Sequence, residues 1–170
     1  MGYDAMLFTE EDYEVALTVY QTIQAGLGLC GGECFGVLLQ PKTEVGDVWV
    51  EEAFQTGPMV LRRSSWEALW AAKQDFCEFD DYGWDWSVVH TMAVGKVPYK
   101  MVAPGKRQVR HIGAKGMHGR EVAGAALSAF GGTELRTGGA RRPAKHRGNG
   151  GWGHPKDHAH CLVSTTTPLD

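Results

Sequence analysis

Little in this sequence points to a membrane, to nucleic acid or to a repeat architecture. No apolar run approaches the roughly 20 residues that a membrane-spanning helix needs, which excludes such a helix from these residues. Charge of one sign is not in excess, because 17 basic side chains stand against 20 acidic ones, and this balance argues against a dedicated nucleic-acid binder. There is no internal repeat, and 170 residues can bury one ordinary core, so we expect one domain.

Cysteine is scarce as well. The four cysteines permit three disulfide pairings, and they are Cys30, Cys34, Cys77 and Cys161. The C-x-x-x-C spacing of the first two could instead be half of a zinc site. A zinc-binding structural module is also suggested by His154 and His158, whose spacing places two ligands on one face of a helix, with His160 close by.

Signals for strands and helices alternate along the chain, which predicts the α/β class. A short buried strand is expected over Ala5 to Phe8, and it delivers the acidic run Glu10, Glu11 and Asp12 at its carboxyl end. Open α/β sheets bind their ligands at that end. From Tyr13 onward the apolar residues recur at helical spacing, which predicts a helix that Gly26 ends.

Further elements are expected in the middle of the chain. Ser64 and Glu67 form a capping-box pattern before a helix. Apolar spacing after Trp86 predicts another helix, with Asp85 at its N-terminal end. Strands are expected over 37–39 and 100–103. A Gly/Arg-rich stretch at about 120–148 has the composition of a solvated, disordered insert. Its arginines could also suit RNA or a membrane surface, although no aromatic side chain lies between them.

Residues 79–86 read FDDYGWDW and combine three aspartates with four aromatic side chains. Such a run suits a sugar, whose C–H faces stack on rings while its hydroxyls need acceptors. Asp85 lies between two tryptophans that would partly exclude water from its carboxylate, so it is a candidate general base. The alternative interpretation is a core turn whose aspartates are solvated.

A divalent cation could be held by residues from distant parts of the sequence. Asp12 follows a strand, and His111 precedes a run of glycines that allow close backbone approach. Mn²⁺ accepts carboxylate and imidazole ligands and leaves positions for substrate oxygens. Taken singly, Asp12 could equally be a helix N-cap, and His111 could be a structural histidine.

Four blocks of the sequence occur in a recognisable order. They are LFTEED at 7–12, Cys77 with FDDYGWDW at 79–86, RHIG and GMH at 110–113 and 116–118, and NGGWG at 149–153 with Asp157, His158 and Cys161. In this order they resemble segments of the N-acetylglucosaminyltransferase II family. The resemblance covers nearly the whole chain except about 122–148.

This resemblance implies the C-terminal portion of a GT-A-type glycosyltransferase domain with a mixed sheet, truncated at its N-terminus. The nucleotide-binding half and the membrane anchor of the family would then be missing. The implied reaction is inverting transfer of N-acetylglucosamine from UDP-N-acetylglucosamine to the 2-hydroxyl of the α1,6-linked mannose of N-glycans. The implied location is the lumenal side of the Golgi membrane, with membrane attachment only through the missing anchor and no nucleic-acid partner.

The resemblance also assigns roles to individual residues. It makes Asp12 and His111 the ligands of Mn²⁺, and it makes Asp85 the catalytic base. The residues expected to contact substrate are Glu10, Glu11, Asp81, Trp84 and Trp86. The glutamates would lie near the nucleotide and the tryptophans would shape the acceptor pocket, while Asp81 could accept acceptor hydroxyls or cap the next turn. The family's cysteine pattern implies the disulfides Cys30–Cys34 and Cys77–Cys161, which suit an oxidising compartment.

The sequence departs from the family pattern in several places: the close-set cysteine pair of the family has one residue fewer between its members, two further disulfides are absent, and His154 stands where the family has an acidic residue. Gly83 stands where many relatives have Asn, which affects acceptor contacts, and Lys115 replaces a cysteine near His111. Two other functions therefore remain open. One is an inactive remnant or glycan-binding module that lacks the nucleotide-binding half. The other is a retaining or hydrolytic enzyme that uses a pair of carboxylates.

Overall fold

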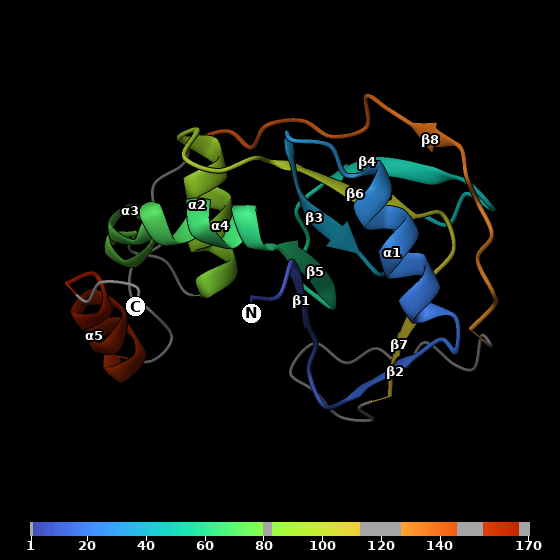
Figure 1. Ribbon diagram of the computed structural model, residues 1–170. Coiled ribbons are helices and arrows are strands. Elements are labelled where there is room, and N and C mark those ends of the chain that lie inside the picture. Colours follow the sequence, from blue (N-terminus) through green and yellow to red (C-terminus); the bar gives the residue numbers. More distant parts are fainter. Residues whose placement is uncertain (1, 80–82, 113–126, 146–154, 167–170) are drawn as a thin grey trace.

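A mixed six-stranded sheet with helices on both faces forms the centre of the molecule (Figure 1). The computed structural model describes residues 2–79, 83–112, 127–145 and 155–166. The strands are β1 (Ala5–Phe8), β2 (Tyr13–Val15), β3 (Cys34–Leu38), β4 (Trp49–Ala53), β5 (Met59–Arg62), β6 (Lys100–Pro104), β7 (Val109–His111) and β8 (Leu135–Arg136). The helices are α1 (Val19–Leu29), α2 (Arg63–Ala71), α3 (Lys73–Glu78), α4 (Trp84–Ala93) and α5 (Pro155–Ser164). This architecture confirms the expected α/β class.

The order of the strands in the main sheet is β1-β5-β3-β6-β4-β8. β5 is antiparallel to both β1 and β3, and β3 is parallel to β6. Consequently β1, β3 and β6 point the same way, and all three finish at one end of the sheet, which we call the carboxyl end. β2 and β7 form a separate antiparallel ribbon. The ribbon follows β1 and β6 in the chain, so it extends from the carboxyl end.

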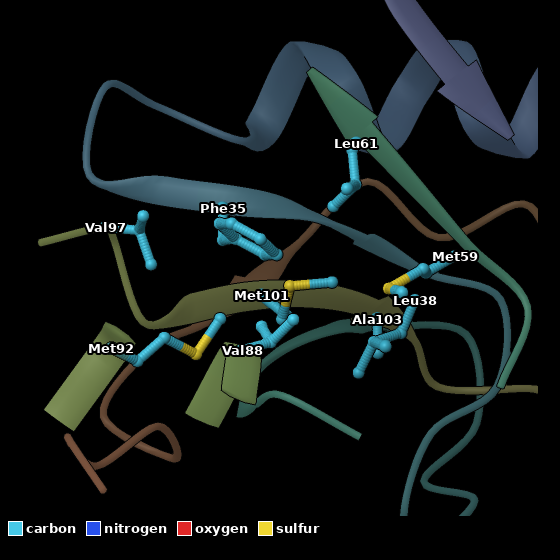
Figure 2. Close-up of a cluster of buried hydrophobic side chains, with 9 residues drawn as sticks. All are labelled: Phe35, Leu38, Met59, Leu61, Val88, Met92, Val97, Met101 and Ala103. Carbon is cyan, nitrogen blue, oxygen red and sulfur yellow. The ribbon is translucent and has the colours of Figure 1, made fainter. Parts of the chain in front are cut away.

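Each face of the sheet carries its own hydrophobic cluster, because successive side chains of a strand point to opposite faces. On one face, side chains such as Phe35 and Met101 pack against Val88 and Met92 of α4 (Figure 2). On the other face, the cluster around Trp49 packs against α1. The two clusters make an α/β/α arrangement in which α4 is fixed firmly against the sheet.

Three expectations for the N-terminal region are wrong. No helix begins at Tyr13, because residues 13–15 pair with β7 as strand β2, and α1 begins only at Val19. Helix α1 also continues through Gly26 to Leu29. A Cβ on Gly26 would come within 2.9 Å of the Trp49 ring, so this glycine permits close packing of helix on sheet. Strand β1 has its expected bounds but lies at the sheet edge, which leaves Met6 and Leu7 exposed instead of buried.

The helices after β5 partly match the sequence-based expectations. Helix α2 is present, but it begins at Arg63 and has no side-chain cap, so the capping box is not formed. Glu67 pairs instead with Arg63, at 2.8 Å. Helix α4 begins at Trp84, earlier than the expected start after Trp86, and Asp85 lies in its first turn, at the N-terminal end where it was expected.

The described part of the Gly/Arg-rich stretch, residues 127–145, differs from the disordered insert that its composition suggests. It runs along the sheet, where β8 pairs with β4 (Figure 1). The indole of Trp49 donates to the carbonyl of Gly132 at 2.8 Å. A Cβ on Gly132 would lie 2.6 Å from the carbonyl oxygen of Asp47, and one on Gly139 would lie 2.3 Å from that of Glu51. The glycines therefore allow this segment to approach the sheet closely.

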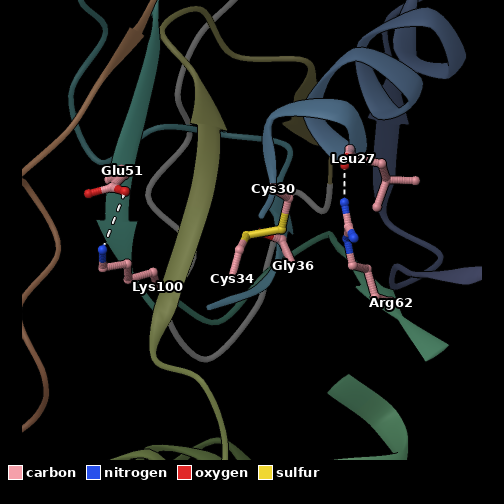
Figure 3. The surroundings of a disulfide bond; sticks show 7 residues. All are labelled: Leu27, Cys30, Cys34, Gly36, Glu51, Arg62 and Lys100. Carbon is pink, nitrogen blue, oxygen red and sulfur yellow. Dashed lines mark hydrogen bonds and ion pairs between the residues drawn. A yellow bond between two sulfur atoms is a disulfide. The ribbon is translucent and has the colours of Figure 1, made fainter. Parts of the chain in front are cut away.

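Both expected disulfides are present. Cys30–Cys34 links the end of α1 to the start of β3, with Cα atoms 5.2 Å apart (Figure 3). Cys77–Cys161 links α3 to α5, with Cα atoms 5.5 Å apart. All four cysteines are thereby used, which rules out a zinc site built on cysteine. Within the described residues, none of the helices combines the length and the apolar content required to cross a bilayer.

Candidate active site

The β2–β7 ribbon brings Asp12 and His111 together. Asp12 precedes β2, His111 ends β7, and the register pairs His111 with Tyr13. The amide of Ile112 donates to the backbone carbonyl of Asp12 at 2.7 Å. As a result, Oδ2 of Asp12 lies 2.8 Å from Nε2 of His111. Two side chains that are 99 positions apart in the sequence thus meet because a short antiparallel pairing aligns them.

Tyr13 packs against this pair. Its ring meets the His111 imidazole edge to face, with centroids 5.2 Å apart. Burial raises the pKa of the Tyr13 hydroxyl above its ordinary value, and the negative charges of Glu10 and Asp12 raise it further. The hydroxyl therefore stays protonated at neutral pH and adds no charge beside His111. The contact between the two rings limits the movement of the His111 imidazole.

The Asp12–His111 pair fits a divalent cation. Oδ1 of Asp12 is buried and has no hydrogen-bond partner among the described residues, although a buried carboxylate oxygen normally has one. Ligands in neighbouring positions of an octahedral ion lie about 2.9 Å apart when the bonds are about 2.0–2.1 Å. The observed 2.8 Å separation is close to that value, and it equally suits a direct hydrogen bond between the two side chains. Within the described residues, no cluster of three or more possible ligands occurs, so other oxygens would have to complete the coordination.

Asp85 lies in the first turn of α4, where its Oδ2 accepts a hydrogen bond of 3.0 Å from the hydroxyl of Thr56. The adjacent side chains Trp84 and Trp86 are 44% and 42% exposed, so their rings are available to a ligand. Trp84 also meets Phe54 edge to face, with centroids 6.4 Å apart. The first turn of α4 thus carries a carboxylate and two partly exposed aromatic side chains, residue types that suit the recognition of a sugar.

The loop between β4 and β5 connects Asp85 with the ribbon that carries the Asp12–His111 pair. Thr56 and Gly57 lead into β5, whose first residue, Met59, pairs with the last residue of β1. The hydroxyl of Tyr13 lies 4.0 Å from the position that a Cβ on Gly57 would occupy. The loop that contacts Asp85 therefore also reaches Tyr13 in the ribbon. The Asp12–His111 pair lies in the ribbon that extends from the carboxyl end of the sheet, and the loop at residues 54–58 links this ribbon to Asp85.

The remaining expected site residues are less well defined. Glu10 and Glu11 are exposed in the turn between β1 and Asp12. Asp81, His154 and the G-M-H and N-G-G-W-G motifs lie outside the described residues. Asp12 precedes a strand, so it is not a helix N-cap. Sequence reasoning missed Thr56 and Tyr13, because neither belongs to a motif and only long-range packing brings them to the site.

Comparison with known proteins shows which family this sequence is similar to. A sequence model of the N-acetylglucosaminyltransferase II family matches residues 38–130. Alpha-1,6-mannosyl-glycoprotein 2-beta-N-acetylglucosaminyltransferase from Rattus norvegicus is 26% identical over 188 residues, covering 92% of this chain and 42% of the relative. The protein of the same name from Arabidopsis thaliana is 28% identical and covers 95% and 44%. The chain thus spans less than half the length of these relatives.

Proposed function

Because the chain belongs to the N-acetylglucosaminyltransferase II family, a family of glycosyltransferases, we propose that the complete protein transfers N-acetylglucosamine from UDP-N-acetylglucosamine to the 2-hydroxyl of the α1,6-linked mannose of N-glycans. The names of the relatives support this donor sugar and acceptor. The observation that supports the proposal is the loop at residues 54–58, which contacts Asp85 through Thr56 and approaches Tyr13 beside the Asp12–His111 pair. The part of the relatives that this chain does not span would supply the remaining donor contacts.

Asp12 and His111 would hold a divalent cation, for which we propose Mn²⁺. Such an ion would supply positive charge that stabilises the diphosphate leaving group as UDP departs. The Oδ1 atom of Asp12 supports this role, because it is buried and has no partner among the described residues. Glu10 and Glu11 would lie close enough to the donor to influence the binding of its nucleotide.

Asp85 would act as the general base. The mannose 2-hydroxyl forms a bond to the anomeric carbon of N-acetylglucosamine, the bond from that carbon to UDP breaks with both electrons leaving on UDP, and Asp85 accepts the hydroxyl proton. The Thr56 hydroxyl donates to Oδ2 and would help to hold the carboxylate in place. Trp84 and Trp86 would stack on the sugar rings, and their exposure supports that use.

We also propose that the protein works in the lumen of the Golgi apparatus. The two disulfides support an oxidising compartment, where such bonds form and persist. Its partners would be the UDP sugar and mannose-terminated N-glycans on glycoproteins. The exposed tryptophans beside Asp85 would equally suit a second candidate function, a glycan-binding module without transferase activity.

The test is a transfer assay on the complete protein with UDP-N-acetylglucosamine, Mn²⁺ and a glycan that ends in an α1,6-linked mannose. We expect the glycan to gain the mass of one N-acetylhexosamine, and we expect chelation of the metal to stop the reaction. A matched acceptor that lacks the mannose 2-hydroxyl should gain nothing. Glycan binding without any transfer would favour the second candidate, and equal transfer to both acceptors would contradict the proposed site of attachment.

A further inference from the structure

Gln108 is a polar side chain that the candidate site does not use directly, yet it is fully buried, with 0% of its surface exposed. It immediately precedes β7, the strand that ends in His111. A buried amide is costly unless its donors and acceptors are satisfied. Its hydrogen bonds therefore indicate what this residue holds together.

The side chain of Gln108 joins three segments that are far apart in the sequence. Its Oε1 lies 3.2 Å from the hydroxyl of Thr22 and 3.4 Å from that of Thr18, so it binds the first turns of α1. Its Nε2 lies 3.3 Å from the carbonyl oxygen of Ser128, in the segment that crosses the sheet. The same nitrogen lies 3.2 Å and 3.1 Å from the carbonyl oxygens of residues 106 and 107, in the turn before β7.

The backbone of Gln108 adds two further connections. Its amide donates to the carbonyl of Leu39, just after β3, at 2.8 Å. Its carbonyl accepts from the amide of Ala16, just after β2, at 2.9 Å. Gln108 and Ala16 therefore form the base of the β2–β7 ribbon, where the ribbon meets the main sheet. Asp12 and His111 lie at the opposite end of the same ribbon.

A two-stranded ribbon is marginally stable by itself and needs packing from its surroundings. The described ribbon consists of only three residue pairs, from Tyr13↔His111 to Val15↔Val109. A shift at its base would therefore be transmitted directly to the two side chains at its tip. Gln108 fixes that base to β3, to α1 and to the segment after residue 127.

We propose that Gln108 is a positioning residue for the Asp12–His111 pair. By anchoring the ribbon, it holds the carboxylate and the imidazole at the separation that a divalent cation requires. This inference rests on the proposed function, because it takes the pair to be a metal site. Gln108 itself would touch neither the ion nor the substrates. Residues that orient metal ligands typically change metal affinity by about 10–100-fold when replaced.

The experiment replaces Gln108 by Met, which has a similar length but neither donates nor accepts through an amide. The matched control is Val97→Ala, which opens a cavity in the cluster under α4, at the opposite face of the sheet from α1. Both variants should lower the melting temperature by a few degrees. The Mn²⁺ affinity of the complete protein in the presence of UDP is measured by water-proton relaxation, and amide hydrogen exchange is measured for Ile112, whose amide donates to Asp12.

We expect Gln108→Met to weaken Mn²⁺ binding by about tenfold or more and to speed exchange of the Ile112 amide. Val97→Ala should change neither, although it is also destabilised. Equal Mn²⁺ affinity in wild type and Gln108→Met, or an equal loss in both variants, would overturn the inference and leave the proposed function standing. If the complete wild-type protein binds no Mn²⁺ in the presence of UDP, the metal site of the proposed function fails, and this inference fails with it.

Discussion

Replacing Asp85 by Asn in the complete protein is expected to lower the turnover of sugar transfer by about 10²–10⁴-fold. Asparagine has the same shape and can still accept the hydroxyl of Thr56 through its amide oxygen. It cannot accept the proton of the attacking mannose hydroxyl, so the chemical step should be affected and the binding steps should not. The measurement is the rate of product formation at saturating donor and acceptor, together with donor affinity measured by calorimetry.

The control for this variant is Asp75→Asn, which removes one negative charge from α3. Asp75 lies 3.7 Å from the ammonium of Lys96 on the surface, and such a surface pair contributes little to stability. We expect this variant to transfer sugar at nearly the normal rate. Near-normal turnover of Asp85→Asn would show that another group takes the proton. A parallel loss of donor affinity would show instead that Asp85 contributes to binding.

Removing the Cys77–Cys161 disulfide is expected to destabilise the chain by about 4.5 kcal/mol, because this bond closes a long loop in the unfolded chain. The two cysteines are 84 positions apart. Helix α5 depends strongly on this bond, since it contains no buried residue. Helix α5 also contacts α3 through the His158 ring, whose Nε2 lies 3.0 Å from the carbonyl oxygen of Cys77. The free energy of unfolding of Cys77→Ala/Cys161→Ala in guanidinium chloride measures this effect.

Cys30→Ala/Cys34→Ala provides the matched comparison. These cysteines are only four positions apart, so the same entropic estimate gives a loss of about 2 kcal/mol. Proteolysis should also separate the two variants, because only the first one releases α5. Equal losses in the two variants would mean that local packing, and not the length of the closed loop, determines how much each disulfide stabilises the chain.

Local sequence patterns were sufficient to predict several parts of the site. The apolar spacing after Trp86 and the acidic residue at the start of that helix place Asp85 correctly in the first turn of α4. The run from Ala5 to Phe8 correctly indicates a strand that leads to Asp12. These predictions succeed because each depends on residues that are neighbours along the chain.

The features that the sequence does not reveal depend on long-range pairing. Tyr13 has the spacing of a helix but becomes a strand, because β7 pairs with it from nearly 100 positions away. The contact of Thr56 with Asp85 and the burial of Gln108 likewise need the folded sheet. The many glycines after residue 127 suggest a disordered insert. In the structure they instead permit close approach of the backbone to the sheet.

The central claim is that the Asp12–His111 pair and Asp85 line one site. Paramagnetic broadening by Mn²⁺ in this chain labelled with 5-fluorotryptophan tests it directly, because the broadening increases steeply as the ion comes closer. Trp84 lies beside Asp85 in α4, whereas Trp66 lies beside Tyr3 and Met6, near the start of β1. We expect Mn²⁺ to broaden the Trp84 signal much more than that of Trp66, and we expect Asp12→Asn to reduce the effect. Equal broadening of both signals, or broadening that Asp12→Asn leaves unchanged, would contradict the claim.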